Sequence, residues 1–309
     1  MRNFIDLATA RRAGLRAILD EAHRRKAARR GLANGAPDAD APLTGHVLAA
    51  IFERPSTRTR FSFDVGMRQL GGTTIVTTGN DMQLGRGESV ADTARVLSRM
   101  VDAIVLRCAV HDTMEELGNH ATVPVLNGLT DLTHPCQAMA DMMTVEERLG
   151  RPVEETCWAW IGDGNNMAHS LIEAASVMGF ELHLGVPHGY DPDQAVVATA
   201  EARGGNIEIV HNAFAAVEGA DVVATDTWVS MGQTAIKDKM AALAPFRVDA
   251  KLMAAALPHA IFLHCLPAHR GEEVTAGVID GPQSAVWDEA ENRLHVQKAI
   301  LLWCLGKIG

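Results

Sequence analysis

The sequence lacks the features that would place the protein in a membrane or on nucleic acid. No apolar run reaches the roughly 18 residues that a membrane-spanning helix needs. Asp and Glu (38) outnumber Lys and Arg (28), and the formal net charge of -10 gives no overall attraction for nucleic acid or anionic lipid. An anion site must therefore be a local cluster of cations, so the position of each arginine is informative.

Cysteine is also scarce. The five cysteines are scattered, odd in number and never arranged as a Cys-x-x-Cys pair, which predicts neither a disulfide framework nor a zinc ribbon. The N-terminus has no apolar secretion segment, and Asp6, Asp20 and Glu21 lie in or beside its basic stretch, which disfavours a transit peptide. We expect an amphipathic helix there and a cytoplasmic protein, because the cytoplasm keeps thiols reduced.

The length of 309 residues is large for one hydrophobic core and predicts two domains. From about residue 45 onward, short apolar runs alternate with helical patterns. This alternation predicts an α/β fold with parallel sheets in two doubly wound domains. The runs that we expect to be strands are Val47–Phe52, Thr73–Thr77, Ala103–Arg107, Val123–Asn127, Trp158–Gly162, Glu181–Val186, Ile207–Val210, Val222–Asp226, Ile261–Cys265 and Ala285–Trp287.

A domain boundary is predicted where a helical pattern that begins near Pro135 ends on Leu149-Gly150-Arg151-Pro152. We expect the domains to be joined by interdomain helices. A final helix, with helical spacing over Glu289–Leu305, is expected to pack back on the first domain. The predicted division is residues 1–148, 149–290 and 291–309.

An anion site is predicted at Ser56-Thr57-Arg58-Thr59-Arg60, which follows the strand ending at Phe52. Ser56 can cap a helix there, and free backbone N–H groups, three hydroxyls and the positive end of the helix dipole together suit a phosphate. A capping box with surface arginines is the alternative. Five such residues in a row at a strand end favour the phosphate.

Further polar residues follow the next strands. Arg107 ends one predicted strand, and His134-Pro135-Cys136-Gln137 opens the helix after another. His134, Gln137 and Arg107 together could polarise a carbonyl group and hold the oxyanion formed on attack, although His134 alone is more typical of a capping or core histidine. Zinc binding by His134 and Cys136 is disfavoured, because no matching pair of ligands occurs elsewhere.

In the second half, Gly162-Asp163-Gly164-Asn165-Asn166-Met167 follows a predicted strand. Because Met167 occupies the third glycine position of a dinucleotide turn, we interpret the segment as a strand-end turn that presents Asn166. The segment from Asp226 to Gly232 combines a carboxylate, which can hold an ammonium group, with a loop able to close. The alternative, a solvated loop, leaves an exposed Trp228 beside Met231 without explanation.

The segment His264-Cys265-Leu266-Pro267-Ala268-His269-Arg270 ends the predicted strand Ile261–Cys265. A cysteine between histidines could be a nucleophile, but no base and orienting group can be assigned to it. We interpret Cys265 as a contact residue. A cis peptide bond before Pro267 is expected to turn the Leu266 carbonyl toward a ligand.

Taken together, Ser-Thr-Arg-Thr-Arg, His-Pro-Cys-Gln, Asp-x-Trp-x-Ser-Met-Gly and His-Cys-Leu-Pro-Ala-His-Arg resemble the ornithine carbamoyltransferases in order and spacing. The resemblance covers almost the whole chain. It implies transfer of the carbamoyl group of carbamoyl phosphate to the side-chain amine of L-ornithine, without a metal or cofactor. The reaction belongs to arginine metabolism; biosynthesis and breakdown use the same groups, and biosynthesis is the expected direction. The resemblance further implies a homotrimer with sites shared between subunits, because the loop that carries Gln83 reaches a neighbouring subunit in this family.

The resemblance also implies a role for individual residues. Catalysis is expected to involve Thr59, Arg107, His134 and Cys265. L-ornithine is expected to contact Asn166, Asp226, Ser230 and Met231. Carbamoyl phosphate is expected to contact Ser56, Thr57, Arg58, Thr59, Gln83, Arg107, His134, Gln137, Cys265, Leu266 and Arg293.

Four other functions compete with this interpretation. An aspartate carbamoyltransferase would need extra cations for a dicarboxylate, where this region offers Asp226, Ser230 and Cys265. An acetylated ornithine lacks the charged amine expected to meet Asp226. A nicotinamide-dependent dehydrogenase needs an acidic residue at a strand end about 20 residues after its glycine turn, whereas Glu181 opens a strand. A catalytically silent phosphate-binding protein would not need the full set of polar groups.

Overall fold

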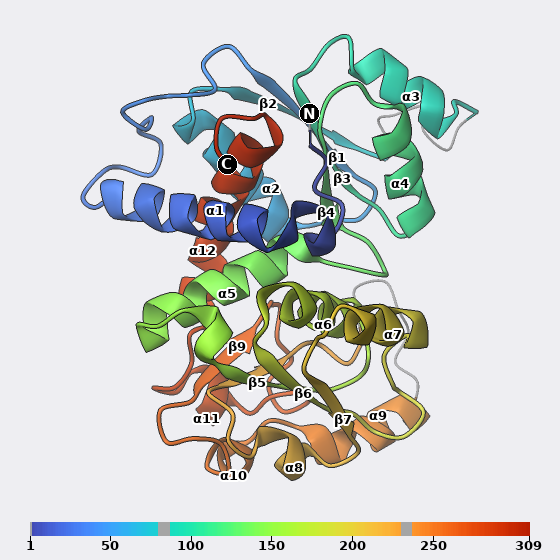
Figure 1. The fold of residues 1–309 in the computed structure, drawn as a ribbon, viewed down its shortest axis with the longest axis vertical. Coiled ribbons are helices and arrows are strands. Elements are labelled where there is room, and N and C mark those ends of the chain that lie inside the picture. The colour runs from blue at the N-terminus through green and yellow to red at the C-terminus, as the bar shows by residue number, and fades with distance from the viewer. Residues whose placement is uncertain (1, 80–86, 230–236) are drawn as a thin grey trace. The chain divides into compact units, whose positions relative to one another are not determined.

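The computed structural model describes residues 2–79, 87–229 and 237–309, and the chain divides into two compact units. Unit 1 comprises Met1–Ala140 with Glu291–Gly309, and unit 2 comprises Asp141–Ala290. Helices α5 (Pro135–Leu149) and α12 (Val286–Cys304) each contribute residues to both units. Each unit is built around its own parallel sheet, which confirms the predicted α/β fold (Figure 1).

Unit 1 contains a four-stranded parallel sheet in the order β2-β1-β3-β4. Figure 1 shows α3 and α4 side by side on one side of this sheet, with α1 and α2 on the other. The carboxyl ends of β1 and β3 are adjacent because Phe52 pairs with Arg107. The bounds are α1 Leu7–Ala28, β1 Val47–Phe52, α2 Thr57–Gln69, β2 Thr73–Thr78, α3 Val90–Leu97, β3 Ala103–Arg107, α4 His111–His120 and β4 Val125–Leu129.

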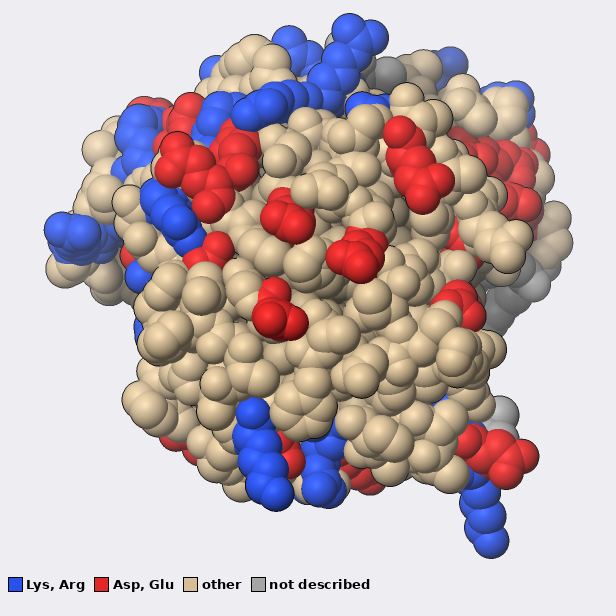
Figure 2. All heavy atoms as spheres, turned by 60° about the horizontal axis from the view of Figure 1, so that its bottom comes forward, with Lys and Arg blue, Asp and Glu red and all other residues tan. Residues whose placement is uncertain are grey.

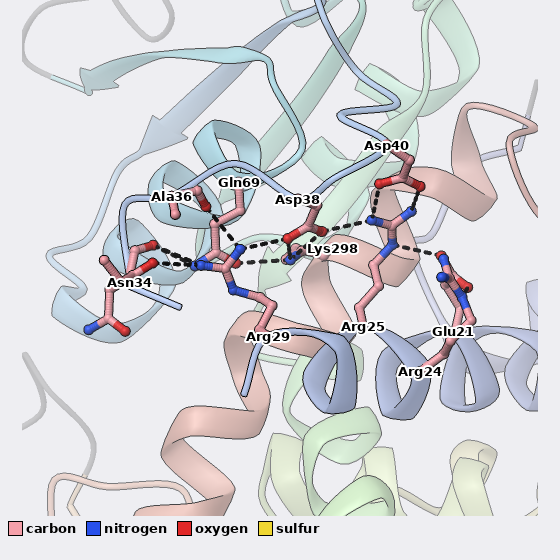
Figure 3. A network of polar contacts seen from close by, with 11 residues as sticks. Glu21, Arg24, Arg25, Arg29, Asn34, Ala36, Asp38, Asp40, Gln69 and Lys298 are labelled. Carbon is pink, nitrogen blue, oxygen red and sulfur yellow. Dashed lines mark hydrogen bonds and ion pairs between the residues drawn. The ribbon is translucent and has the colours of Figure 1, made fainter. Parts of the chain in front are cut away.

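A buried ionic network ties the loop between α1 and β1 to helices of unit 1 (Figure 3). The Asp38 carboxylate accepts hydrogen bonds from Arg25 of α1 and from Arg29, the C-cap of α1, at 2.7 Å each and from Lys298 of α12 at 2.9 Å. Lys298 also donates to Gln69 at 2.9 Å. One carboxylate thus neutralises part of a cluster of three cations, and so anchors α12 against α1 and α2 within unit 1.

Unit 2 contains a five-stranded parallel sheet in the order β7-β6-β5-β8-β9. Helices α6 and α7 cover one face and α8 the other (Figure 1). The core beside α8 is made of apolar side chains, including Ile161, Val223 and Phe262. The bounds are η1 Val153–Glu155, β5 Cys157–Ile161, α6 Asn166–Met178, β6 Glu181–Gly185, α7 Gln194–Ala202, β7 Ile207–Val210, α8 Ala213–Val217, β8 Val222–Thr225, α9 Lys237–Leu243, η2 Ala244–Phe246, α10 Ala250–Met253, β9 Ile261–His264 and α11 Ala276–Ile279.

Nine of the ten expected strands are present, with small shifts at their ends, and one expectation was wrong. Residues 285–287 do not form a strand: α12 begins at Val286, and only Ser284 makes an isolated bridge, to Phe262. A three-residue apolar run carries too little periodicity to distinguish a strand from the first turn of a helix. The strand expected at Val123–Asn127 is observed two residues later, at Val125–Leu129.

No helix within the described ranges is long and apolar enough to cross a membrane. Figure 2 shows one face of the molecule, on which separate Asp and Glu side chains occupy the middle and Lys and Arg lie mainly toward the margins. This face offers no broad basic surface among the described residues, in keeping with the net charge of -10.

Candidate active site

The predicted helix start at Ser56 is confirmed in unit 1. Ser56 is the N-cap of α2, and its hydroxyl accepts the Thr59 N–H at 3.3 Å. A cavity of about 450 Å³ lies at this helix start, and its lining includes Ser56, Thr57 and Arg60. The first backbone N–H groups of a helix have no partner within the helix and carry a partial positive charge, so this end of α2 suits an anion.

Arg293 brings two of the predicted site residues together. Its Nη1 donates to the Gln137 Oε1 at 2.6 Å, and its Nη2 donates to the Thr59 Oγ1 at 3.0 Å. All three side chains are buried. Helices α2, α5 and α12 therefore meet in unit 1 at one buried guanidinium, and charge-assisted bonds of this kind contribute about 1.5–3 kcal/mol each.

Gln297 supports the same arginine and was not predicted from the sequence. In the amide orientation that satisfies both of its polar atoms, its oxygen accepts from Arg293 Nη2 at 3.0 Å and from Nε at 3.2 Å. Gln297 lies four residues after Arg293 in α12, and residues at this spacing share a helix face. This spacing is the one feature of the sequence that could have indicated Gln297 as a partner of Arg293. It is too common to identify a site by itself.

His134 is an uncharged imidazole at neutral pH. It directly precedes α5 and is 4% exposed. Burial, together with the cations Arg293, Arg107 and Arg58, lowers the pKa of His134 well below its usual value. Arg58, Arg107 and Arg293 therefore each lie within electrostatic reach of His134 in unit 1. A neutral imidazole among them can exchange a hydrogen bond without adding a fourth positive charge.

Asp226 is the centre of the polar groups in unit 2. It directly follows β8 and is 9% exposed. Its Oδ1 accepts the Thr227 N–H at 2.7 Å and the Cys265 thiol at 2.9 Å, and its Oδ2 accepts from Asn165 Nδ2 at 3.3 Å. Three donors thus hold a nearly buried carboxylate at the carboxyl ends of β8 and β9, the edge of a parallel sheet where ligands bind.

Cys265 is a thiol and not a thiolate. Burial and the neighbouring Asp226 carboxylate raise the pKa of Cys265 well above its usual value. A protonated thiol is a poor nucleophile, and its hydrogen is already donated to Asp226. The described geometry thus activates no nucleophile at Cys265, and a role of Cys265 in ligand contact stays a prediction.

The turn after β5 serves packing and helix capping. A side chain at Gly164 would lie 2.2 Å from the backbone nitrogen of Pro192, so this position needs a glycine because another segment approaches closely. Asn165 caps α6 by accepting the N–H groups of Met167 at 2.9 Å and Ala168 at 3.1 Å. Asn166 is consequently the first residue of α6.

The segment after β9 is held by a buried histidine and a buried glutamate. The Leu266 N–H donates to His264 Nδ1 at 2.8 Å, and His264 Nε2 lies 3.2 Å from Glu273 Oε1. Leu266 has a φ of 57°, in the left-handed region that costs a non-glycine residue roughly 1–2 kcal/mol. The expected cis peptide bond between Leu266 and Pro267 is present.

Several expectations fall outside the described residues or need correction. Gln83, Ser230 and Met231 lie outside the described ranges. Trp228 was expected to be exposed, but it is only 3% exposed. The exposure of a side chain depends on what packs over it in the folded chain, which the sequence pattern does not reveal. Ser56, Thr57, Arg58, Thr59, Arg107, His134, Gln137 and Arg293 belong to unit 1, whereas Asn166, Asp226, Cys265 and Leu266 belong to unit 2.

Both halves of the chain match models of known protein families. Residues 2–147 match "Aspartate/ornithine carbamoyltransferase, carbamoyl-P binding domain", and residues 154–304 match "Aspartate/ornithine carbamoyltransferase, Asp/Orn binding domain". The ornithine carbamoyltransferase of Rhizorhabdus wittichii is 62% identical over 308 residues, which are 100% of this chain and 99% of that protein.

Solved structures of ornithine carbamoyltransferases are also similar to this chain. The ornithine carbamoyltransferase of Pyrococcus furiosus is similar with a TM-score of 0.93 at 46% identity, over 100% of this chain and 98% of that one. The anabolic ornithine carbamoyltransferase of Campylobacter jejuni is similar with a TM-score of 0.91 at 35% identity, over 99% and 100% of the two chains.

Proposed function

The chain belongs to the aspartate/ornithine carbamoyltransferase family, and we propose that it works with the side chains described above. It transfers the carbamoyl group of carbamoyl phosphate to the side-chain amine of L-ornithine, giving L-citrulline and phosphate. The observation that carries the assignment of residues is the buried Arg293, which joins Thr59 and Gln137 near His134.

Unit 1 binds carbamoyl phosphate. The phosphate lies at the start of α2, where Ser56, Thr57, Arg58 and Thr59 offer backbone N–H groups, hydroxyls and a guanidinium. Its carbamoyl oxygen faces Arg107, His134 and Thr59. Gln137 and Arg293 complete the set, and Arg293 holds Thr59 and Gln137 in place. Fixed donors of this kind stabilise the charge that develops in the transition state.

The transfer itself is an attack of an amine on a carbonyl. The lone pair of the ornithine side-chain nitrogen forms a C–N bond with the carbamoyl carbon, and the carbonyl oxygen becomes an oxyanion held by Arg107, His134 and Thr59. The C–O bond to phosphate then breaks, phosphate departs with the bonding electrons, and one amine proton goes to phosphate or to a group of the site. His134 contributes hydrogen bonding rather than charge, because it is neutral.

Unit 2 binds L-ornithine. Asp226 holds the α-ammonium group, and Asn166, Ser230 and Met231 contact the α-amino and carboxylate groups. Support comes from the Asp226 carboxylate, which three donors fix in one orientation at the sheet edge. Cys265 and Leu266 contact both ligands. An aspartate acceptor is disfavoured, since Lys239, a cation of this unit, is already paired with Asp163 at 2.6 Å.

Copies of the chain form a homotrimer in the cytoplasm, where the enzyme acts in arginine biosynthesis. In support of assembly through unit 1, Phe61 of α2 and Ile75 of β2 are 64% and 54% exposed. Phe61 also lines the cavity at the start of α2. Apolar side chains exposed next to a binding site are typical of surfaces that a partner covers. Gln83 is expected to complete a neighbouring subunit's site.

A citrulline assay tests the function directly. The purified enzyme is given carbamoyl phosphate with ornithine, aspartate, putrescine or N-acetylornithine in parallel. Citrulline should form from ornithine, and product from aspartate alone would overturn the proposed acceptor. Sedimentation equilibrium on the same sample tests assembly: a mass three times 33.1 kDa is expected, and a monomer at assay concentration would contradict the trimer.

A further inference from the structure

His264 has both ring nitrogens engaged inside unit 2. Its side chain is fully buried at the end of β9. Nδ1 accepts the Leu266 N–H at 2.8 Å, so this nitrogen carries a lone pair and no hydrogen. Nε2 must then carry the hydrogen, and it donates to Glu273 Oε1 at 3.2 Å. The glutamate therefore selects the one neutral tautomer that can accept from Leu266.

Glu273 is itself fixed. It is fully buried, and its Oε1 also accepts the His269 N–H at 2.5 Å. Its backbone carbonyl accepts the Val248 N–H at 2.8 Å. The His264 main chain is anchored from another direction, because its N–H donates to Glu289 Oε2 at 2.8 Å. The Glu273 carboxylate and the His264 ring are therefore both held in place. Together they form a rigid support for the residues that follow β9.

Leu266 needs such a support. Its backbone lies in the left-handed region, where a side chain is unfavourable, and the bond from its N–H to the His264 ring opposes relaxation. Cys265, directly before it, is held through its thiol to Asp226 at 2.9 Å. Each of the two residues that are assigned to ligand contact is thus fastened by a separate buried group.

We propose that Glu273 and His264 are positioning residues, which hold the Leu266 main chain in its ligand-binding conformation through one chain of hydrogen bonds. The proposal rests on the proposed function, in which Cys265 and Leu266 contact the substrates. Glu273 supplies orientation and needs no substrate contact. Its effect passes through the His264 ring to the Leu266 N–H.

Two replacements of His264 separate positioning from stability. The amide oxygen of His264→Asn can take the place of Nδ1 and accept from Leu266, but it leaves Glu273 without its partner. The amide nitrogen of His264→Gln can take the place of Nε2 and donate to Glu273, but it leaves the Leu266 N–H unsatisfied. We expect kcat/KM for ornithine to be about tenfold higher in His264→Asn than in His264→Gln, and the thermal unfolding midpoint to be higher in His264→Gln.

The decisive result is that kcat/KM and the unfolding midpoint rank the two variants in opposite orders. If Glu273 and His264 only stabilised the fold, the variant with the higher unfolding midpoint would also have the higher kcat/KM. Equal kcat/KM values, or an activity order that matches the order of unfolding midpoints, would overturn the proposal. The matched control is Glu272→Gln, whose side chain is 46% exposed, and it should retain wild-type kinetics. If the wild-type enzyme makes no citrulline, the proposed function fails instead, so the two failures are distinguishable.

Glu273 gives a second comparison, and its two single variants do not depend on the His264 variants folding. Glu273→Gln keeps an oxygen that can accept from His264, whereas Glu273→Leu has a similar shape and cannot. We expect Glu273→Gln to stay within about threefold of wild-type kcat/KM and Glu273→Leu to lose about tenfold. In the His264→Asn background the same Glu273→Leu change should have no further effect on kcat/KM, because the connection is already broken. Fully additive losses would contradict the chain of hydrogen bonds.

Discussion

Arg293 of α12 donates to Gln137 of α5 at 2.6 Å, although the two residues are 156 positions apart in the sequence. The same guanidinium reaches Thr59 at 3.0 Å. One planar, always charged group can hold both partners at once, which an ammonium group on a flexible stem does poorly. The site of unit 1 therefore depends on a residue that is contributed by the end of the chain.

Arg293→Lys should lose one or both of these bonds while keeping the charge. We expect KM for carbamoyl phosphate to rise about 10- to 100-fold, since each charge-assisted bond contributes about 1.5–3 kcal/mol. Steady-state kinetics at saturating ornithine measure the change. Arg270→Lys is the matched control, because Arg270 lies at the surface and pairs with Asp280. An unchanged KM in Arg293→Lys would show that the arginine has no part in binding.

The pH dependence should come from the substrate amine and not from His134. Burial and the neighbouring arginines lower the pKa of His134 well below its usual value, so the ring is neutral at neutral pH and stays neutral as the pH rises. The ornithine amine has a free pKa near 10.4, and deprotonating it at pH 7 costs about 4–5 kcal/mol. We expect kcat/KM to rise from about pH 6 to pH 9 in the wild type, because more of the amine becomes neutral.

His134→Gln tests this assignment. Glutamine has no titratable ring, and its flexible side chain holds a donor less firmly than the imidazole does, so we expect kcat to fall about 10²- to 10³-fold, as when a transition-state donor is removed. The slope of the pH–rate profile should stay the same as in the wild type. Loss of the slope in this variant would identify His134 as the titrating group and contradict the neutral imidazole.

Cys265→Ser should remain an active enzyme. A serine hydroxyl can donate to Asp226 as the thiol does, and the raised pKa of Cys265 keeps the thiolate scarce at neutral pH. We expect kcat within about tenfold of the wild type, whereas loss of a covalent nucleophile costs several orders of magnitude. Single-turnover kinetics measure the effect. A loss of kcat beyond about 10⁴-fold would instead indicate that Cys265 is a nucleophile.

Asp38→Asn should destabilise unit 1, because it leaves Arg25, Arg29 and Lys298 without their shared counter-charge. We expect the free energy of unfolding in urea to fall by about 3–5 kcal/mol at pH 7. Asp40→Asn is the matched control: the Asp40 side chain is 52% exposed, and its pair with Arg25 should contribute about 0–1 kcal/mol. Equal effects of the two variants would contradict a special role for Asp38.

The same variant should also change the response to acid. Burial raises the pKa of Asp38, but hydrogen bonds from Lys298, Arg29 and Arg25 outweigh it and lower the pKa below the ordinary value of 3.8. A carboxyl group with a lowered pKa stabilises the fold above its unfolded value, and this stability is lost as the pH falls below about 3.8. Asp38→Asn should therefore lose less stability than the wild type between pH 4 and pH 3, and an identical loss would contradict the assignment.

Local sequence determined the architecture. Strands such as Val47–Phe52 and Ile207–Val210 lie where the alternation of apolar runs and helical patterns predicts them. Ser56 caps a helix as its side chain and position suggest. These features depend on residues close together in the chain, whose periodicity and capping chemistry can be read directly. The order and spacing of the motifs were also enough to indicate the family.

Tertiary packing decided which distant residues meet. Gln297 contacts Arg293, Lys298 contacts Asp38, and Glu273 contacts His264. No sequence motif predicts these pairs. The first turn of α12 looked like a strand, and Trp228 looked exposed, because short segments are settled by the surfaces that cover them. Burial and the proximity of other charges then set the protonation of His134 and Cys265, and both quantities exist only in the folded chain.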